Sequence, residues 1–155
     1  MDVEGSYVTI ERLNRSLVYS QKTQGPADDI CIGCLCEAAS QCNTTMGCQG
    51  NVCGLFRITY PYWVDAGKPV ISLDDPTSPD AWVRCVTEPF CAAQTVQQYF
   101  TRFQQDCNGD GTIDCVDFAS IHHLGGYGCS SGNPWNKEFE NRFYTCLTSV
   151  KALTG

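Results

Sequence analysis

The stretch from Asp106 to Asp117 carries oxygen-bearing side chains at the spacing of a twelve-residue calcium loop. Oxygen donors occupy positions 1, 3, 5, 9 and 12 of this stretch, Gly111 occupies position 6, and the β-branched Ile113 occupies position 8. The predicted ligands are Asp106, Asn108, Asp110, the carbonyl of Thr112, Asp114 and Asp117. Calcium takes about six to eight oxygen ligands, so this set predicts a structural Ca²⁺ ion.

A second interpretation of the same loop needs no metal. Glycine and asparagine are frequent in polar turns because they tolerate unusual backbone geometry. A disulfide between Cys107 and Cys115 would close such a turn covalently. The residues alone leave the calcium loop and the disulfide-closed turn both open.

The cysteines predict a disulfide framework. The chain has 155 residues and twelve cysteines, an even number. A zinc site is the alternative for clustered cysteines, but the spacings are irregular and only two histidines are present. Disulfides persist in oxidising compartments, so the framework predicts a secreted, extracellular protein. The residues are Cys31, Cys34, Cys36, Cys42, Cys48, Cys53, Cys85, Cys91, Cys107, Cys115, Cys129 and Cys146, and their pairing does not follow from spacing.

Length and charge narrow the class of protein. A chain of 155 residues is the size of one domain and can bury a substantial core. The net charge of −7 disfavours binding to nucleic acid and, at low ionic strength, to other anionic surfaces. No run of about eighteen apolar residues is present, so no membrane span is predicted. An apolar signal segment is also missing, which is typical of a mature form.

Three segments together resemble a known family. They read Cys34-Leu-Cys36-Glu-Ala-Ala39-Ser40-Gln-Cys42, then Cys53-Gly-Leu-Phe-Arg-Ile58 with Tyr62-Trp63-Val-Asp65, and finally Cys115-Val-Asp-Phe-Ala-Ser-Ile-His122-His-Leu-Gly-Gly-Tyr-Gly-Cys129. This pattern resembles the invertebrate-type lysozymes, also called the destabilase family, over residues 31–146. The resemblance implies a lysozyme-like fold and a cleft that binds peptidoglycan or chitin-type glycans.

The resemblance also implies that the catalytic carboxylates are missing. The family motifs place a Glu at the position of Ala39 and an Asp at the position of Asn51. The segment between Cys48 and Cys53 is shortened as in the insect branch of the family, where both carboxylates are often lost. Glu37 does not replace the acid, because it lies about 200° round a helix from Ala39. We therefore expect a catalytically inactive, glycan-binding member of the family.

The family's cleft implies the binding residues. They are Tyr60, Tyr62, Trp63 and His122, whose rings could hold sugars by aromatic faces and hydrogen bonds. Each of them could instead be a core residue. Two other functions stay open, namely an active lysozyme with a non-standard site and a module that binds a protein partner. The Ser/Lys isopeptidase activity of some members is not expected, since Thr59 stands at the position of the family's Lys.

The elements that must position these residues form an α+β, lysozyme-like, mostly helical and disulfide-rich domain with a small β-sheet. We expect residues 1–30 to form an N-terminal extension with a short strand over 6–13, and residues 31–155 to form the lysozyme-type domain. Within the domain, the patterns predict helices over 31–42, 62–66, 91–105 and 115–124, a helix capped by Ser78, a last helix from Asn133, and a strand over 55–60.

Overall fold

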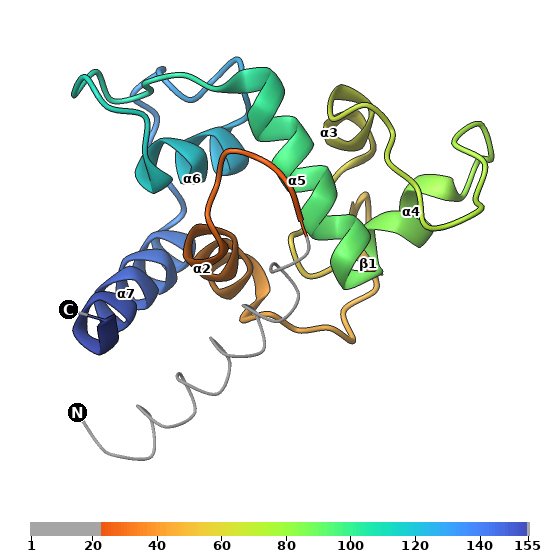
Figure 1. Cartoon of the computed structure of the whole chain (residues 1–155), viewed down its shortest axis with the longest axis horizontal. Coiled ribbons are helices and arrows are strands. Elements are labelled where there is room, and N and C mark those ends of the chain that lie inside the picture. The colour runs from red at the N-terminus through yellow and green to blue at the C-terminus, as the bar shows by residue number, and fades with distance from the viewer. Residues whose placement is uncertain (1–22, 155) are drawn as a thin grey trace.

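The computed structural model describes residues 23–154 and confirms a mostly helical α+β fold with a small sheet (Figure 1). The elements are α2 (Asp29–Ser40), β1 (Cys48–Gln49), β2 (Val52–Cys53), α3 (Tyr60–Asp65), α4 (Ala81–Val86), α5 (Pro89–Phe103), α6 (Cys115–Leu124) and α7 (Lys137–Thr154). Among the helices of this range, none is both long enough and apolar enough to cross a membrane. The strand expected over 6–13 lies outside the described residues.

The helices pack in two groups. Helices α2 and α7 lie side by side, and α5 packs between α6 and the short helices α3 and α4 (Figure 1). The core between them contains large side chains with under 2% exposure, among them Trp63, Phe100 and Phe143. Burial of side chains of this size stabilises the fold by about 2 kcal/mol each.

Helix α2 is enclosed on almost every side. The Asp28 carboxylate caps it by accepting from the Cys31 amide, and the helix ends where Gln41 adopts a left-handed conformation. All residues from Cys31 to Ala38 are buried, so α2 has no solvent-exposed stripe along this stretch. A helix buried all round needs partners on every face, and α7 supplies the largest of these contacts.

Six disulfides join the elements. Three start on α2, namely Cys31–Cys115 to α6, Cys34–Cys146 to α7, and the local Cys36–Cys42. The others are Cys48–Cys53, Cys85–Cys91 and Cys107–Cys129. The disulfide between Cys107 and Cys115 that we considered is therefore wrong. Cys107 and Cys115 lie in the same loop region, but Cys107 bonds to Cys129 and Cys115 bonds to Cys31.

The strand predicted over 55–60 is wrong. The sheet is a two-stranded antiparallel hairpin in which Cys48 pairs with Cys53 and Gln49 pairs with Val52. Residues 54–57 form a turn, after which Ile58 makes one isolated bridge to Cys53. Positive φ angles at Gly54 and Arg57 break the extended backbone. Leu55 and Phe56, which lie between these two residues, are buried in the core. Their apolar side chains gave the segment the composition of a buried strand.

Helices α4, α5 and α7 begin at residues other than those predicted, because the residues that cap them differ from those expected. Helix α5 begins at Pro89 rather than at residue 91, because the Glu88 carboxylate accepts from the amides of Phe90 and Cys91. Ser78 does not cap α4, since its hydroxyl accepts from Arg84 and the helix begins at Ala81. The last helix begins at Lys137, after Asn136 caps it, and α6 covers the predicted residues.

The segment before α2 docks on α5. The buried Gln97 side chain accepts from the Ala27 amide and donates to the Ala27 carbonyl. Gln94 makes the same pair of hydrogen bonds with the backbone of Gln24. Residues 24–27 are thus fixed against the core, although they were assigned to the N-terminal extension.

We predict that Gly54→Ala destabilises the protein far more than Gly50→Ala. Both glycines have positive φ, but a Cβ on Gly54 would lie 1.8 Å from the Val86 carbonyl oxygen, whereas nothing lies within 4 Å of one on Gly50. We expect a loss of about 3 kcal/mol or more for Gly54→Ala and about 1 kcal/mol for Gly50→Ala. Denaturant unfolding measures both, and equal losses would show that backbone strain, not close packing, requires Gly54.

Candidate functional site

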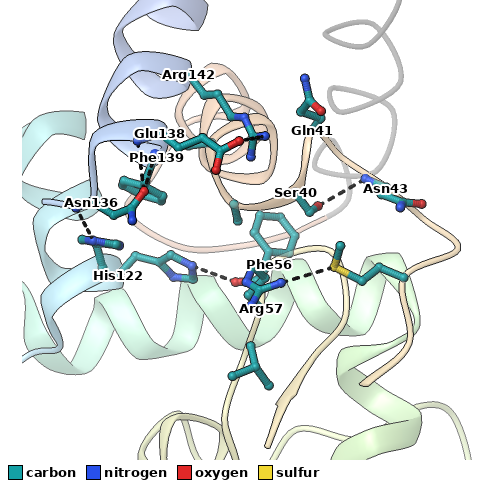
Figure 2. A pocket seen from close by; sticks show the side chains of 15 residues that line it. Ser40, Gln41, Asn43, Phe56, Arg57, His122, Asn136, Glu138, Phe139 and Arg142 are labelled. Carbon is teal, nitrogen blue, oxygen red and sulfur yellow. Dashed lines mark hydrogen bonds and ion pairs between the residues drawn. The ribbon is translucent and has the colours of Figure 1, made fainter. Parts of the chain in front are cut away.

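A pocket of about 720 Å³ opens at the end of α2, against the turn after β2 and the start of α7 (Figure 2). Its volume is within the range of small-molecule and oligosaccharide sites, about 300–1,000 Å³. The lining residues are Ala38, Ala39, Ser40, Gln41, Asn43 and Met46 from α2 and the following loop, Val52, Phe56 and Arg57, His122 and His123 from α6, and Asn136, Glu138, Phe139 and Arg142.

Ala39 lies in the pocket wall, as expected for the position of the family's acid. It contributes only a methyl group, so no proton donor stands at this point. The neighbouring Ser40 is buried, and its hydroxyl donates to the Leu55 carbonyl and accepts from the Asn43 amide. Ser40 therefore fixes the wall of the pocket through two hydrogen bonds to the backbone.

The second replaced position lies elsewhere. Asn51 is exposed in the two-residue turn of the β1–β2 hairpin and does not line the pocket. Glu37 is buried at 5% exposure and does not line it either. Of the two positions that resemblance assigned to the carboxylates, the fold thus brings only Ala39 to the pocket.

His122 closes one side of the pocket and is held by two hydrogen bonds. Its Nε2 lies 3.0 Å from the Phe56 carbonyl oxygen, and its Nδ1 lies 2.8 Å from the Tyr62 hydroxyl. Because a carbonyl oxygen can only accept, Nε2 carries the proton and Nδ1 accepts from Tyr62. Desolvation lowers the pKa of His122 to about 4, so the ring is neutral at neutral pH. Both nitrogens are used within the fold.

Tyr62 and Trp63, which were assigned to sugar stacking, do not line the pocket. The Tyr62 ring is partly buried and stacks on Tyr99 with centroids 3.7 Å apart, and burial raises its pKa well above the usual value. Trp63 has 1% exposure and donates from Nε1 to the Pro69 carbonyl. Trp63 is therefore a core residue, and one face of Tyr62 is covered by Tyr99.

Tyr60 is exposed but does not line the pocket. It packs edge-on against Trp82, which belongs to α4. Of the four predicted binding residues, the structure therefore places only His122 at the pocket. On the short helix α3, the Tyr60 ring lies beside that of Trp63, with centroids 5.8 Å apart, whereas the Tyr62 ring lies against Tyr99.

The pocket also contains residues that sequence reasoning missed, mainly from α7. Glu138 and Arg142 form an ion pair one helical turn apart, and the Asn136 amide donates to Nε2 of His123 at 2.9 Å. The ring of His123 stacks on Phe139. The spacing of Glu138 and Arg142 was visible in the sequence. Their place beside Ala39 follows only from the packing of α7 on α2.

The acidic loop before α6 brings some of its predicted ligands together. Carboxylate oxygens of Asp106, Asp110 and Asp117 lie within 4.8 Å of one another. Asp106 also accepts from the amides of Gly109, Asp110 and Gly111.

The other predicted ligands have local partners. Asp117 accepts from the Cys107 and Asp114 amides, which forms a capping box with Asp114 at the start of α6. Asp114 accepts from the Val116 amide, and Asn108 accepts from the Asp110 amide. The Thr112 amide donates to Asp110. The loop has the carboxylates that a calcium site needs. The same side chains also accept hydrogen bonds from many of the loop's backbone amides.

Comparison with known proteins decides the family. The model of the destabilase family matches residues 28–146. The chain belongs to this family, that of the invertebrate-type lysozymes. It is 32% identical over 129 residues to invertebrate-type lysozyme 3 of Caenorhabditis elegans, which covers 79% of this chain and 91% of the relative.

Solved structures agree with this assignment. A complex of Meretrix lusoria lysozyme with Aeromonas hydrophila PliI aligns with a TM-score of 0.63 at 28% identity, over 79% of this chain and 93% of the other. Tapes japonica lysozyme aligns with a TM-score of 0.58 at 26% identity, over 80% of this chain and 91% of the other. The predicted lysozyme-like fold is confirmed.

We predict that this destabilase-family protein loses stability as the pH falls from about 6.5 to 4. The folded state holds His122 neutral with a pKa of about 4, whereas the unfolded chain takes up the proton near pH 6.5. Its contribution is complete above pH 6.5 and is lost toward pH 4, by about 3 kcal/mol.

NMR titration of His123→Gln tests this directly, because the chain has two histidines and only His122 would remain. We expect its ring signals to titrate near pH 4. A midpoint near 6.5 would contradict the buried, doubly bonded ring. The matched stability measurement is denaturant unfolding at pH 7 and pH 4.5.

Proposed function

We propose that this protein binds a peptidoglycan-type or chitin-type oligosaccharide in the Ala39 pocket and does not hydrolyse it. The observation that carries the proposal is the methyl group of Ala39 in the wall of a pocket of about 720 Å³. The six disulfides support an extracellular location, since such bonds form in oxidising compartments.

The carboxyl groups of the pocket do not meet the needs of the reaction. Glycoside hydrolysis uses a pair of carboxyl groups, one of which protonates the leaving oxygen. Among the described residues that line the pocket, Glu138 is the single carboxylate. It is largely exposed and paired with Arg142, which is unlike the apolar setting of a general acid. Loss of a general acid alone slows such reactions by about a hundredfold to ten-thousandfold.

Polar groups of the pocket suit the hydroxyl and acetamido groups of a sugar. The Asn136 side-chain oxygen accepts from the backbone amides of Glu138 and Phe139, and the Asn43 side-chain oxygen accepts from Thr45. This leaves the NH₂ group of each asparagine directed away from its own backbone partners. An NH₂ group is a donor for sugar oxygens. Binding without cleavage therefore uses groups that the loss of the acid did not remove.

A calorimetric titration tests the binding. We predict that a chitotetraose or a peptidoglycan tetrasaccharide binds the wild type, and that Ala39→Trp weakens binding by about tenfold or more by filling the pocket. Gln98→Trp is the matched control, because Gln98 is exposed on α5 and does not line the pocket. It should bind as the wild type does.

Two outcomes would contradict the proposal. One is that neither saccharide binds the wild type. The other is that the wild type releases reducing ends from either saccharide faster than a blank without protein, with Ala39→Glu, Asn51→Asp, the variant that has carboxylates at both assigned positions, measured beside it. The second outcome would favour the alternative function, an active lysozyme with a non-standard site.

A protein ligand is the second candidate for the same pocket. Two of the similar solved structures are of an inhibitor-bound lysozyme from Meretrix lusoria and of its complex with Aeromonas hydrophila PliI. By analogy with these complexes, a protein is the alternative ligand for this pocket. In that case the saccharide titrations would fail while the protein stayed folded.

We also propose that the loop from Asp106 to Asp117 binds a structural calcium ion. The twelve-residue spacing and the approach of three carboxylates to within 4.8 Å support this. The ion would join the end of α5 to the start of α6. Cys107–Cys129 fixes the same loop, so calcium adds stability to a segment that is already constrained.

Thermal unfolding with calcium or with chelator tests this site. We predict that about 10 mM calcium raises the melting temperature by a few degrees, as for an ion with millimolar affinity. Asp110→Asn should abolish the shift. Asp75→Asn is the control, because Asp75 accepts from Thr77 in a different polar turn. A wild-type melt that does not respond to calcium would leave the disulfide-held turn as the correct account.

A further inference from the structure

The charge of the pocket differs in sign from that of the whole chain. The chain carries a net charge of −7, but its pocket is lined by two arginines and one carboxylate. His122 and His123 each use a ring nitrogen as an acceptor, so both are neutral as the fold holds them. A local excess of positive charge inside an acidic surface concentrates anionic ligands at that point.

Arg57 is the cation that gives the pocket this excess. Four arginines lie within residues 23–154, and three of them pair with carboxylates, as Arg84 does with Asp74, Arg102 with Asp65 and Arg142 with Glu138. Within the same range, Arg57 has no carboxylate partner.

The contacts of Arg57 leave one edge of its guanidinium for a ligand. Its Nη1 donates to Gln49 Oε1 at 3.0 Å and contacts the Met46 sulfur at 3.8 Å. Both contacts use the same nitrogen, so the edge formed by Nε and Nη2 has no partner among the described residues. This edge matches the two oxygens of a carboxylate, which it can bind through two parallel hydrogen bonds.

The backbone conformation at Arg57 is strained. Its φ of 56° lies in the left-handed region, which is unfavourable for a residue with a Cβ. Buried neighbours on both sides maintain this conformation, since Phe56 accepts from His122 and Ile58 pairs with Cys53. The strained turn directs the arginine to the pocket (Figure 2). Backbone strain of this kind is concentrated at functional sites.

We propose that Arg57 makes the pocket selective for acidic saccharides, by binding a carboxylate of the ligand through its Nε–Nη2 edge. This selectivity rests on the proposed glycan-binding function and specifies its ligand class. Arg142 enters the pocket from α7, but its charge is balanced by Glu138, so Arg57 supplies the unbalanced positive charge of the pocket. The carboxylate could belong to the lactyl ether of a muramic-type sugar or to a uronic acid.

Calorimetry with three matched tetrasaccharides tests the selectivity. They are neutral chitotetraose, an alternating N-acetylglucosamine and N-acetylmuramic acid tetrasaccharide, and a tetragalacturonide. We expect at least one acidic saccharide to bind the wild type about tenfold more tightly than chitotetraose at low ionic strength, with the advantage reduced by salt. The acidic saccharide that gains affinity identifies the source of the carboxylate.

Three variants locate the effect. Arg57→Gln should weaken binding of the preferred acidic saccharide about tenfold more than it weakens binding of chitotetraose, which removes the preference. Arg57→Lys should restore only part of the preference, because an ammonium group lacks the two-pronged edge. Arg102→Gln removes the same charge from α5, outside the pocket, and should keep the full preference.

The outcomes separate this inference from the function on which it rests. Equal affinity of the wild type for neutral and acidic saccharides would overturn the selectivity and leave glycan binding intact. An equal loss of both affinities in Arg57→Gln would show that Arg57 only supports the turn, and would also overturn it. Absence of binding to all three saccharides would overturn both proposals.

Discussion

The structure depends on the way in which α2 is fixed inside the molecule. Two disulfides join it to segments that are 84 and 112 residues away, through Cys31–Cys115 and Cys34–Cys146. Cross-links across such long separations restrict the unfolded chain strongly. They also hold α6 and α7 at fixed positions relative to α2. The pocket lies where these three helices meet the turn after β2, so its shape depends on the same two bonds.

A second, non-covalent network fixes the remaining side of the pocket. His122 joins the turn at Phe56 to Tyr62 of α3, and Tyr62 stacks on Tyr99 of α5. The Tyr99 hydroxyl in turn accepts from the Gly126 amide after α6. Buried polar networks of this kind are stable only when each member has its partner. The family-like His122 and Tyr62 are therefore explained by the fold itself, whether or not the protein has a catalytic function.

The two positions that the resemblance assigned to the carboxylates lie outside both networks. Ala39 lines the cavity with a methyl group, and Asn51 stands in the exposed turn of the β1–β2 hairpin, outside the pocket. The polar groups around the cavity include amides, two arginines and one carboxylate.

Much of the fold follows from local features of the sequence. Helix α6 has a capping carboxylate at Asp114 and a glycine directly after its last residue, so its limits could be predicted from neighbouring residues alone. The resemblance likewise assigned the family's acid to the position of Ala39, which the fold places in the pocket wall. The even number of cysteines predicted a disulfide framework, but their spacing contains no information on which distant segments approach one another.

The tertiary structure decided what depends on long-range packing. Composition could not show that Leu55 and Phe56 belong to a buried turn, because the close approach of Gly54 to Val86 comes from a segment about 32 residues later in the chain. It could not show that Trp63 is buried or that Tyr62 stacks on Tyr99, since an aromatic residue has the same type in a core as in a cleft. The placement of Arg57 and of the Glu138–Arg142 pair in one pocket with Ala39 also required the fold. Ala39, Arg57 and this pair lie on three separate segments, and only the packing of α7 on α2 and the left-handed turn at Arg57 bring them together.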